Sequence, residues 1–118
     1  MKEEDLIRIG AIMDCEGSAG IYLVKTGQKK KDGTEYPRYP RPKISIGMIH
    51  DNYLRIQIFS KMGFGRLIPT KKTSAGNQFW VYSCYSRDAL KFAKLIKDYC
   101  SIKKEILEQI IEFYRRKV

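Results

Sequence analysis

The sequence predicts a single α+β domain with one four-stranded sheet, and three observations support this class. Polar and apolar residues alternate in strand-like stretches such as 44–48, whereas apolar residues recur at helical spacing in four other stretches. The 118 residues are 43% hydrophobic, enough for one compact core but too few for two ordinary domains. No internal repeat is visible. The predicted order along residues 1–118 is therefore helix, strand, strand, helix, strand, strand, helix, helix.

The first helix is predicted over about residues 4 to 14. Acidic residues at its start suit the positive end of a helix dipole, and the apolar run behind them lasts until the Gly17-Ser18 break. Two strands follow, separated by a long, lysine-rich connection over 25–41. We expect four apolar residues of these strands to face the core: Ile21, Leu23, Ile44 and Ile46.

The second half of the chain predicts a helix of about a dozen residues that ends at Gly63, and then a hairpin. The strands of the hairpin, 66–69 and 78–83, flank a polar turn over 70–77. Ser86 suits the N-cap of the next helix. The last helix is outlined by four residues: Ile102, Ile106, Ile110 and Tyr114.

The charge of the chain favours a polyanionic partner. Lys and Arg number 23 against 13 Asp and Glu, which gives a net charge of +10 and a pI near 9.6. No stretch approaches the roughly 20 apolar residues of a membrane span, and the N-terminus is too acidic for a signal or transit peptide. Cys15, Cys84 and Cys100 lack metal-ligand spacing and read as core or spectator thiols. We expect a protein of the cell interior, in the cytoplasm or an organellar matrix, with no membrane partner.

The first helix has two apolar sides. Leu6, Ile9 and Met13 form one side, which can enter the core. The other side is flat because Gly10 and Ala11 have almost no side chain, so a second helix could approach it closely. This side is a candidate dimer interface, and it consists of Ile7, Gly10, Ala11 and Asp14. The same pattern is also typical of a helix that packs against its own sheet.

Two carboxylates, Asp14 and Glu16, come at the end of this helix, next to the Gly17-Ser18 turn. Hard divalent cations prefer oxygen ligands, and Mg²⁺ accepts one or two carboxylates together with water and substrate phosphate. The pair is therefore a candidate metal site. The spacing alone is equally typical of a solvated turn.

The stretch from Ile9 to Ser18 resembles the LAGLIDADG motif of homing endonucleases, and nearly every position carries a residue of the same chemical kind as the motif. The predicted elements that follow, with Gly63-Phe64-Gly65 before the third strand, are also similar to that family. The resemblance implies the family's fold, with a four-stranded antiparallel DNA-binding sheet. Because the chain has one motif copy, it resembles the homodimeric branch.

The resemblance also implies roles for individual residues. Glu16 and the backbone carbonyl of Cys15 would hold Mg²⁺, whereas Ca²⁺ would bind without supporting cleavage. Lys103, with Lys104 as the alternate, would orient water or stabilise the phosphate charge, and Asp14 would tie down the end of a helix.

The chain departs from the motif at several positions. The two small residues, Gly10 and Ala11, stand in the order Gly-Ala instead of Ala-Gly. Cys15 occupies a position where the motif usually has Ala or Gly, and the acidic residue is Glu16 instead of Asp. Gly47 cannot supply a polar active-site group near the end of the second strand. His50 could substitute, or it could be a helix cap or a surface residue.

The expected DNA contacts follow from strand alternation and from basic loops. If the apolar residues named above face the core, the opposite face carries candidate base contacts: Tyr22, Val24, Thr26, Lys43, Ser45, Arg66, Ile68, Trp80 and Tyr82. Strand aromatics are also common in cores, which leaves Trp80 and Tyr82 open. The candidate phosphate contacts, equally typical of solvated loops, are Gln28, Lys29, Lys30, Lys31, Arg38, Arg41, Lys71 and Lys72.

The expected function is that of an intron-encoded, Mg²⁺-dependent endonuclease that cuts double-stranded DNA at a long pseudo-palindromic site. Two alternatives share the scaffold. One is a maturase that binds intron RNA, and the other is a non-catalytic DNA-binding regulator. An intact Glu16 and Lys103 favour cleavage over both.

Overall fold

The computed structural model describes residues 1–49, 53–72, 76 and 78–116. The predicted element order is confirmed. The elements are α1 (Glu3–Glu16), β1 (Gly17–Val24), β2 (Tyr39–Ile49), α2 (Tyr53–Ser60), β3 (Arg66–Lys72), β4 (Gln78–Tyr85), α3 (Arg87–Ile96), the 3₁₀ turn η1 (Lys97–Tyr99) and α4 (Lys104–Arg115). None of the helices in these ranges is long and apolar enough to cross a membrane.

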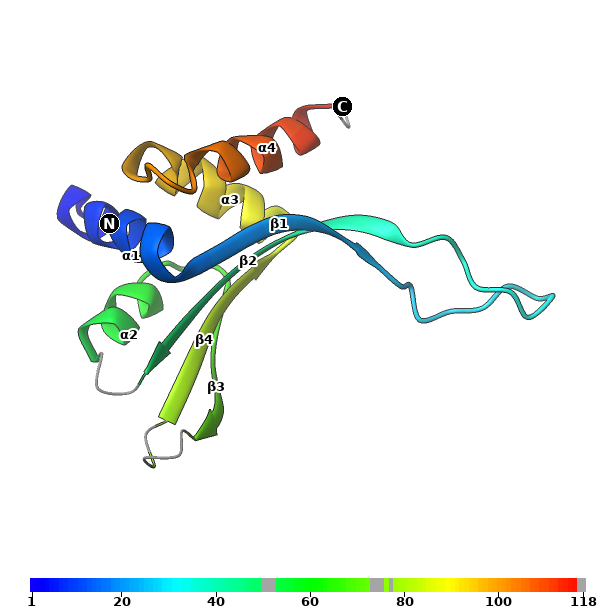
Figure 1. Cartoon of the computed structure of the whole chain (residues 1–118), viewed down its shortest axis with the longest axis horizontal. Coiled ribbons are helices and arrows are strands. Elements are labelled where there is room, and N and C mark those ends of the chain that lie inside the picture. The colour runs from blue at the N-terminus through cyan, green and yellow to red at the C-terminus, as the bar shows by residue number, and fades with distance from the viewer. Residues whose placement is uncertain (50–52, 73–75, 77, 117–118) are drawn as a thin grey trace.

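The four strands form one antiparallel sheet in the order β1-β2-β4-β3. Helices α1, α3 and α4 lie on one side of it, and the other side is open (Figure 1). Alternate residues of β2 point into the core, so Ile44, Ile46 and Met48 are buried, as their alternation predicts. The core is completed by buried residues of the helices, among them Ile9, Met13, Phe92, Ile96, Leu107 and Ile110.

Two residues predicted to be buried in β1 are not. Ile21 and Leu23 pair with Pro42 and Pro40, so they lie on the helix side of the sheet. They are nevertheless 37% and 66% exposed. β1 is an edge strand, so it has a neighbouring strand, β2, on one side only. Alternation gave the correct side of the strand, but it carries no information on how far the helices extend over that side.

The prediction that Trp80 and Tyr82 lie on the open face is wrong. Tyr82 pairs with Ile46 and is only 1% exposed, and Trp80 pairs with Met48 and packs against the core. The cause is an irregularity in the hairpin. Between Pro69 and Lys72 strand β3 advances three residues while β4 advances two, from Trp80 to Gln78. Such a bulge shifts the pairing by one residue, so the β4 residues that share a face with a given β3 residue change. Counting from the turn as if the hairpin were regular therefore assigns the β4 side chains to the wrong face.

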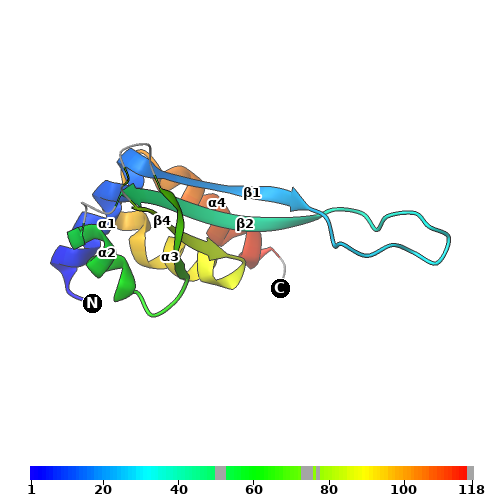
Figure 2. The same ribbon diagram turned by 90° about the horizontal axis from the view of Figure 1, so that it is seen from below.

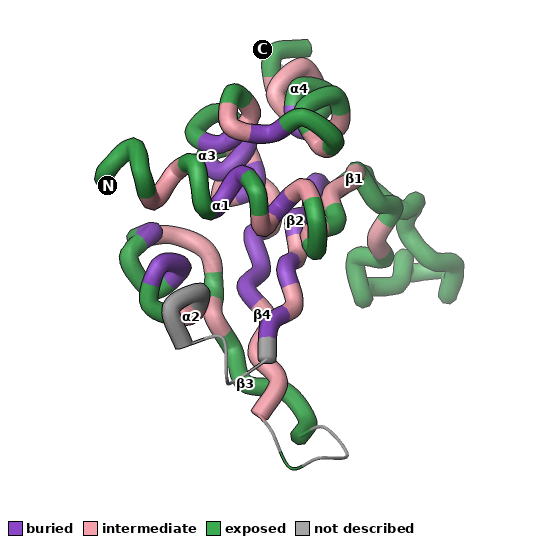
Figure 3. Tube along the Cα trace, turned by 60° about the vertical axis from the view of Figure 1, so that its left-hand side comes forward, coloured by how far each residue is buried: buried purple, intermediate pink, exposed green. Residues whose placement is uncertain are grey.

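Residues 25–38 form an arm that projects far beyond the helices (Figures 1 and 2). The long connection predicted over 25–41 is shorter than expected because β2 already begins at Tyr39. A single bridge between Lys29 and Glu35 holds the two halves of the arm together. The arm is exposed throughout (Figure 3), and it contributes to the 51 Å length of the molecule.

Candidate metal site and nucleic-acid interface

The end of α1 is tied to the beginning of α4 by one carboxylate. Asp14 accepts hydrogen bonds from the backbone N–H groups of Ser101, Ile102 and Lys103, at 2.8, 3.0 and 3.0 Å. These donors belong to the turn over 101–103, whose last residue, Lys103, is the N-cap of α4. Partial desolvation pushes the pKa of Asp14 upward, but the backbone hydrogen bonds outweigh it and hold that pKa below its ordinary value. Asp14 thus has the structural role that the motif implies.

This connection brings the backbone of Lys103 to the end of α1 that carries Glu16. Glu16 is the last residue of α1 and is exposed, and Lys103 occupies the N-cap position of α4. The Asp14 carboxylate, two residues before Glu16, accepts the N–H of Lys103 itself. Lys104 is the first residue of α4 and is exposed.

The chemistry at the end of α1 suits a hard cation. The last turn of α1 has no basic residue, and the C-terminus of a helix is electronegative. The Glu16 carboxylate can supply oxygen ligands for a metal ion. The Cys15 carbonyl can do so too, because it is among the last carbonyls of the helix. Within the ranges described, no group of three or more His, Cys, Asp or Glu could hold a metal ion.

A side chain at position 47 would have to displace the ring of Phe79. A Cβ added to Gly47 would lie 2.6 Å from the tip of the Phe79 ring, which covers this position. The predicted alternative, His50, lies outside the described residues.

The predicted dimer interface on α1 is only half exposed. Gly10 is buried against η1, and a Cβ added to it would lie 2.6 Å from the Cβ of Tyr99. Asp14 faces the same way, toward the start of α4. The prediction that Gly10 lies on an exposed side is therefore wrong, because Gly10 packs against its own chain, whereas Asp14 is half-buried. Ile7, which is 54% exposed, and Ala11 remain on the surface.

The open face of the sheet carries most of the predicted base-contact positions. Strand pairing places six of them there, namely Tyr22, Val24, Lys43, Ser45, Arg66 and Ile68. Thr26 lies beyond β1, in the arm. Sequence reasoning missed Phe79, Val81, Ser83 and Tyr85, the β4 residues that the bulge turns to this face. Arg41, predicted as a phosphate contact, also lies on this face, opposite Tyr22.

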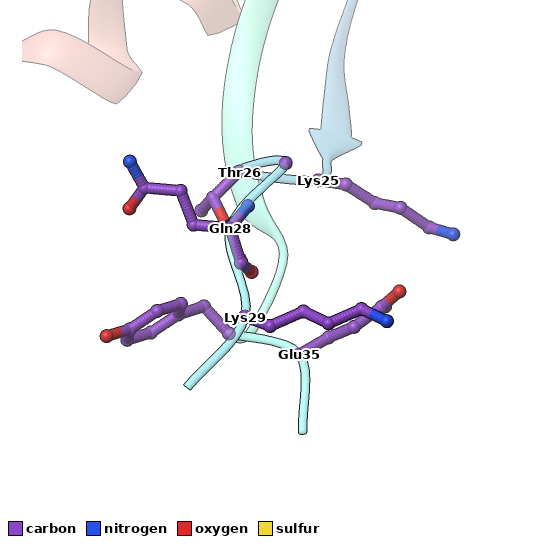
Figure 4. Close-up of a pocket in the computed structure, with 7 residues that line it drawn as sticks. Lys25, Thr26, Gln28, Lys29 and Glu35 are labelled. Carbon is purple, nitrogen blue, oxygen red and sulfur yellow. Dashed lines mark hydrogen bonds between the residues drawn. The ribbon is translucent and has the colours of Figure 1, made fainter. Parts of the chain in front are cut away.

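The arm carries exposed positive charge. It has five basic and two acidic residues, and its predicted phosphate contacts at 28–31 and Arg38 are all exposed. At its base is a shallow cavity of about 90 Å³, lined by Lys25, Thr26, Gly27, Gln28, Lys29, Glu35 and Tyr36 (Figure 4). The labelled side chains of Lys25 and Gln28 point in different directions in that view. The remaining predicted contacts, Lys71 and Lys72, are exposed at the end of β3.

Three solved structures illustrate what this fold resembles. The homing endonuclease I-CvuI, in complex with its target, is 12% identical with a TM-score of 0.67, and the match covers 94% of this chain and 68% of that one. An archaeal intron-encoded homing endonuclease complexed with DNA is 19% identical with a TM-score of 0.61, over 93% and 67% of the two chains.

A third similar structure is the I-LtrWI LAGLIDADG homing endonuclease bound to target DNA. It is 13% identical with a TM-score of 0.61, and the match covers 98% of this chain and 39% of that one. No model of a known protein family matches the sequence, and no curated protein matches it closely enough to count as a relative.

Proposed function

We propose that this chain, which has the fold of the LAGLIDADG homing endonucleases, is a site-specific endonuclease of double-stranded DNA that acts as a homodimer. The observation that carries the proposal is the position of the Asp14 carboxylate. It joins the end of α1, where Glu16 is the last residue, to the backbone of Lys103 at the N-cap of α4. A carboxylate and an ammonium group carried by these two segments would suit phosphodiester hydrolysis.

The open face of the sheet would lie in the major groove. A two-stranded ribbon fits this groove, and its side chains can reach base edges there. The arm would follow the DNA backbone beyond the sheet, where its lysines would contact phosphates. Such contacts give affinity that depends on salt but carry no sequence information.

The exposed side of α1 would form the dimer interface. Ile7, Ala11 and Cys15 follow one another at intervals of four residues, and all three are exposed. Two copies of α1 packed along this side would be related by a two-fold axis. Their ends would then lie side by side, each with its own Glu16, and the two sheets would extend along a pseudo-palindromic duplex.

Glu16 and the Cys15 carbonyl would hold Mg²⁺ at the end of α1. The ion would supply an activated water and neutralise charge on the leaving 3′-oxygen. Lys103 would contribute a positive charge near the scissile phosphate, and Asp14 would keep Lys103 in position through the backbone. The negative end of α1 would further favour the cation.

Cleavage of a randomised duplex library tests this proposal. The wild type, Glu16→Gln and the control Glu108→Gln, which changes an exposed acid on α4, are incubated with Mg²⁺ or Ca²⁺, and all DNA ends are sequenced. We expect Mg²⁺-dependent double-strand breaks at one inverted-repeat site for the wild type and the control. Glu16→Gln should bind the same site without cutting it.

Binding without cutting by the wild type under every condition would contradict the endonuclease. The same binding assay is then repeated with structured RNA. Preference for the duplex would indicate a DNA-binding regulator, and preference for the RNA would indicate a maturase.

A further inference from the structure

Three residues from three elements meet at the outer end of the open face. Arg41 comes from β2, Tyr85 is the last residue of β4, and Ser86 follows at the N-cap of α3. The guanidinium carbon of Arg41 lies 4.5 Å from the centroid of the Tyr85 ring. The Nε–H of Arg41 donates to the Ser86 hydroxyl at 3.3 Å. The guanidinium is therefore held through its face and through one of its nitrogens.

Ser86 holds Arg41 instead of capping its own helix. A serine at an N-cap ordinarily accepts a backbone N–H of the first turn, but the Ser86 side chain makes no such bond. Its backbone has φ 53° and ψ −120°, a conformation that residues other than glycine rarely adopt. The backbone N–H of Ser86 donates to the carbonyl oxygen of Pro42 at 3.0 Å, which ties this turn to β2. Such strained residues cluster at functional sites.

The backbone on either side of Arg41 is also stiff. Pro40 and Pro42 flank it, and each ring fixes one backbone dihedral. Prolines are tolerated here because β4 ends at Tyr85, which pairs with Lys43. Residues 39–42 thus have β1 as their only strand neighbour in the described sheet. Arg41 is fixed through its backbone as well as through its side chain.

This arrangement leaves the two terminal nitrogens of Arg41 for a ligand. No carboxylate in the described part of the chain pairs with Arg41. A planar guanidinium with a fixed orientation presents two parallel donors, which match the O6 and N7 acceptors of guanine in the major groove. A phosphate contact needs no such fixation, and flexible lysines serve that purpose in the arm.

We infer that Arg41 reads a guanine in each half of the target site and that Tyr85 and Ser86 position it for this contact. The inference rests on the proposed function and names one base of its substrate. Arg41 pairs with Tyr22, six residues after Glu16 along β1. At about 3.3 Å per residue this is roughly 20 Å from the end of α1. With base pairs about 3.4 Å apart, the guanine lies about six base pairs from the cut.

Binding selection from a randomised duplex library in Ca²⁺ tests the inference. We expect the wild type to enrich an inverted repeat with a guanine at both symmetric positions. Arg41→Gln should reduce the preference for that guanine roughly tenfold or more, while the other positions stay unchanged. The arm variant Lys29→Gln is the control, and it should lower affinity without changing any base preference.

Three further variants test the positioning residues. Tyr85→Leu and Ser86→Gly should weaken the same guanine preference, whereas Tyr85→Phe, which keeps the ring, should retain it. Ser86→Gly removes the hydroxyl but accepts the positive φ, so its fold is expected to persist. Thermal unfolding of each variant verifies this.

The possible failures are distinguishable. An equal loss of affinity for all sequences in Arg41→Gln, with a weaker salt dependence, would identify a phosphate contact and overturn the inference alone. An unchanged guanine preference in Arg41→Gln would also overturn it. If the wild type enriches no duplex sequence, the proposed function fails, and the inference fails with it.

Discussion

The carboxylate of Asp14 accepts the backbone N–H of Lys103 across 89 residues of sequence, at 3.0 Å. The same carboxylate also accepts the N–H groups of Ser101 and Ile102. It therefore caps the turn over 101–103 that leads into α4, and it holds this turn against the end of α1. Two predictions follow from this contact.

Replacing Asp14 by Asn should destabilise the protein by roughly 1–2 kcal/mol. The amide has one acceptor oxygen instead of two, and it has no charge to interact with the electropositive start of α4. Urea unfolding measures the change. The matched control is Asp98→Asn, because Asp98 is exposed and forms an ion pair with the neighbouring Lys97. The control should change stability little, and an equal loss in both variants would contradict the capping role.

The contribution of Asp14 should depend on pH in a defined direction. Its pKa in the folded protein lies below the ordinary value of 3.8. A carboxyl group of this kind stabilises the fold fully above its unfolded pKa, and it loses that contribution as the pH falls through the folded pKa. The stability difference between wild type and Asp14→Asn should therefore be constant between about pH 5 and 7 and shrink below about pH 4. Urea unfolding across this range is the measurement, and a difference that grows on acidification would be inconsistent with the lowered pKa.

Gly10 and Ala11 are neighbours in sequence but should respond differently to substitution. Gly10→Ala forces a methyl group into the space of Tyr99 and should cost roughly 1–3 kcal/mol of stability. Ala11→Glu introduces charge on the exposed side of α1 and, under the proposed function, should convert the dimer to a monomer. Thermal unfolding and sedimentation equilibrium separate the two effects. A dimer that survives Ala11→Glu would place the interface elsewhere.

The lysines of the arm should control the salt dependence of DNA binding. Changing Lys29, Lys30 and Lys31 to Gln removes three charges, and each phosphate contact contributes about 0.9 to the slope of log K against log salt. The slope should fall by about 2 to 3. The matched control changes Lys61, Lys91 and Lys94 to Gln, which are exposed outside the arm. Equal slopes for the two triple variants would contradict the phosphate role of the arm.

The three cysteines should differ in reactivity toward alkylating reagents. Burial raises the pKa of Cys84 to about 11, and that of Cys100 to about 12, so both remain thiols at pH 8. Cys15 is exposed on α1. Iodoacetamide at pH 8 should modify Cys15 first in the Ala11→Glu variant, whose proposed α1 interface is broken, and the other two only after unfolding. Mass spectrometry of the native protein measures this, and modification of Cys84 at the rate of Cys15 would contradict its burial.

Local pattern in the sequence was sufficient for the elements and for the motif. Alternation in 44–48 predicts a strand with one buried face, and helical spacing predicts α3 and α4, because each signal repeats within a few residues. Glu16 and Asp14 could be identified for the same reason, since the motif that contains them is continuous in the chain.

The tertiary structure decided which faces and which partners these elements have. Tyr82 lies in the core because one bulge in β3 changes the register of the hairpin. Gly10 is buried against η1, and Ser86 holds Arg41 instead of capping α3. Each of these outcomes depends on contact between segments far apart in sequence or on a count of residues across a turn. Periodicity repeats along one segment and carries no information about the segment that packs against it.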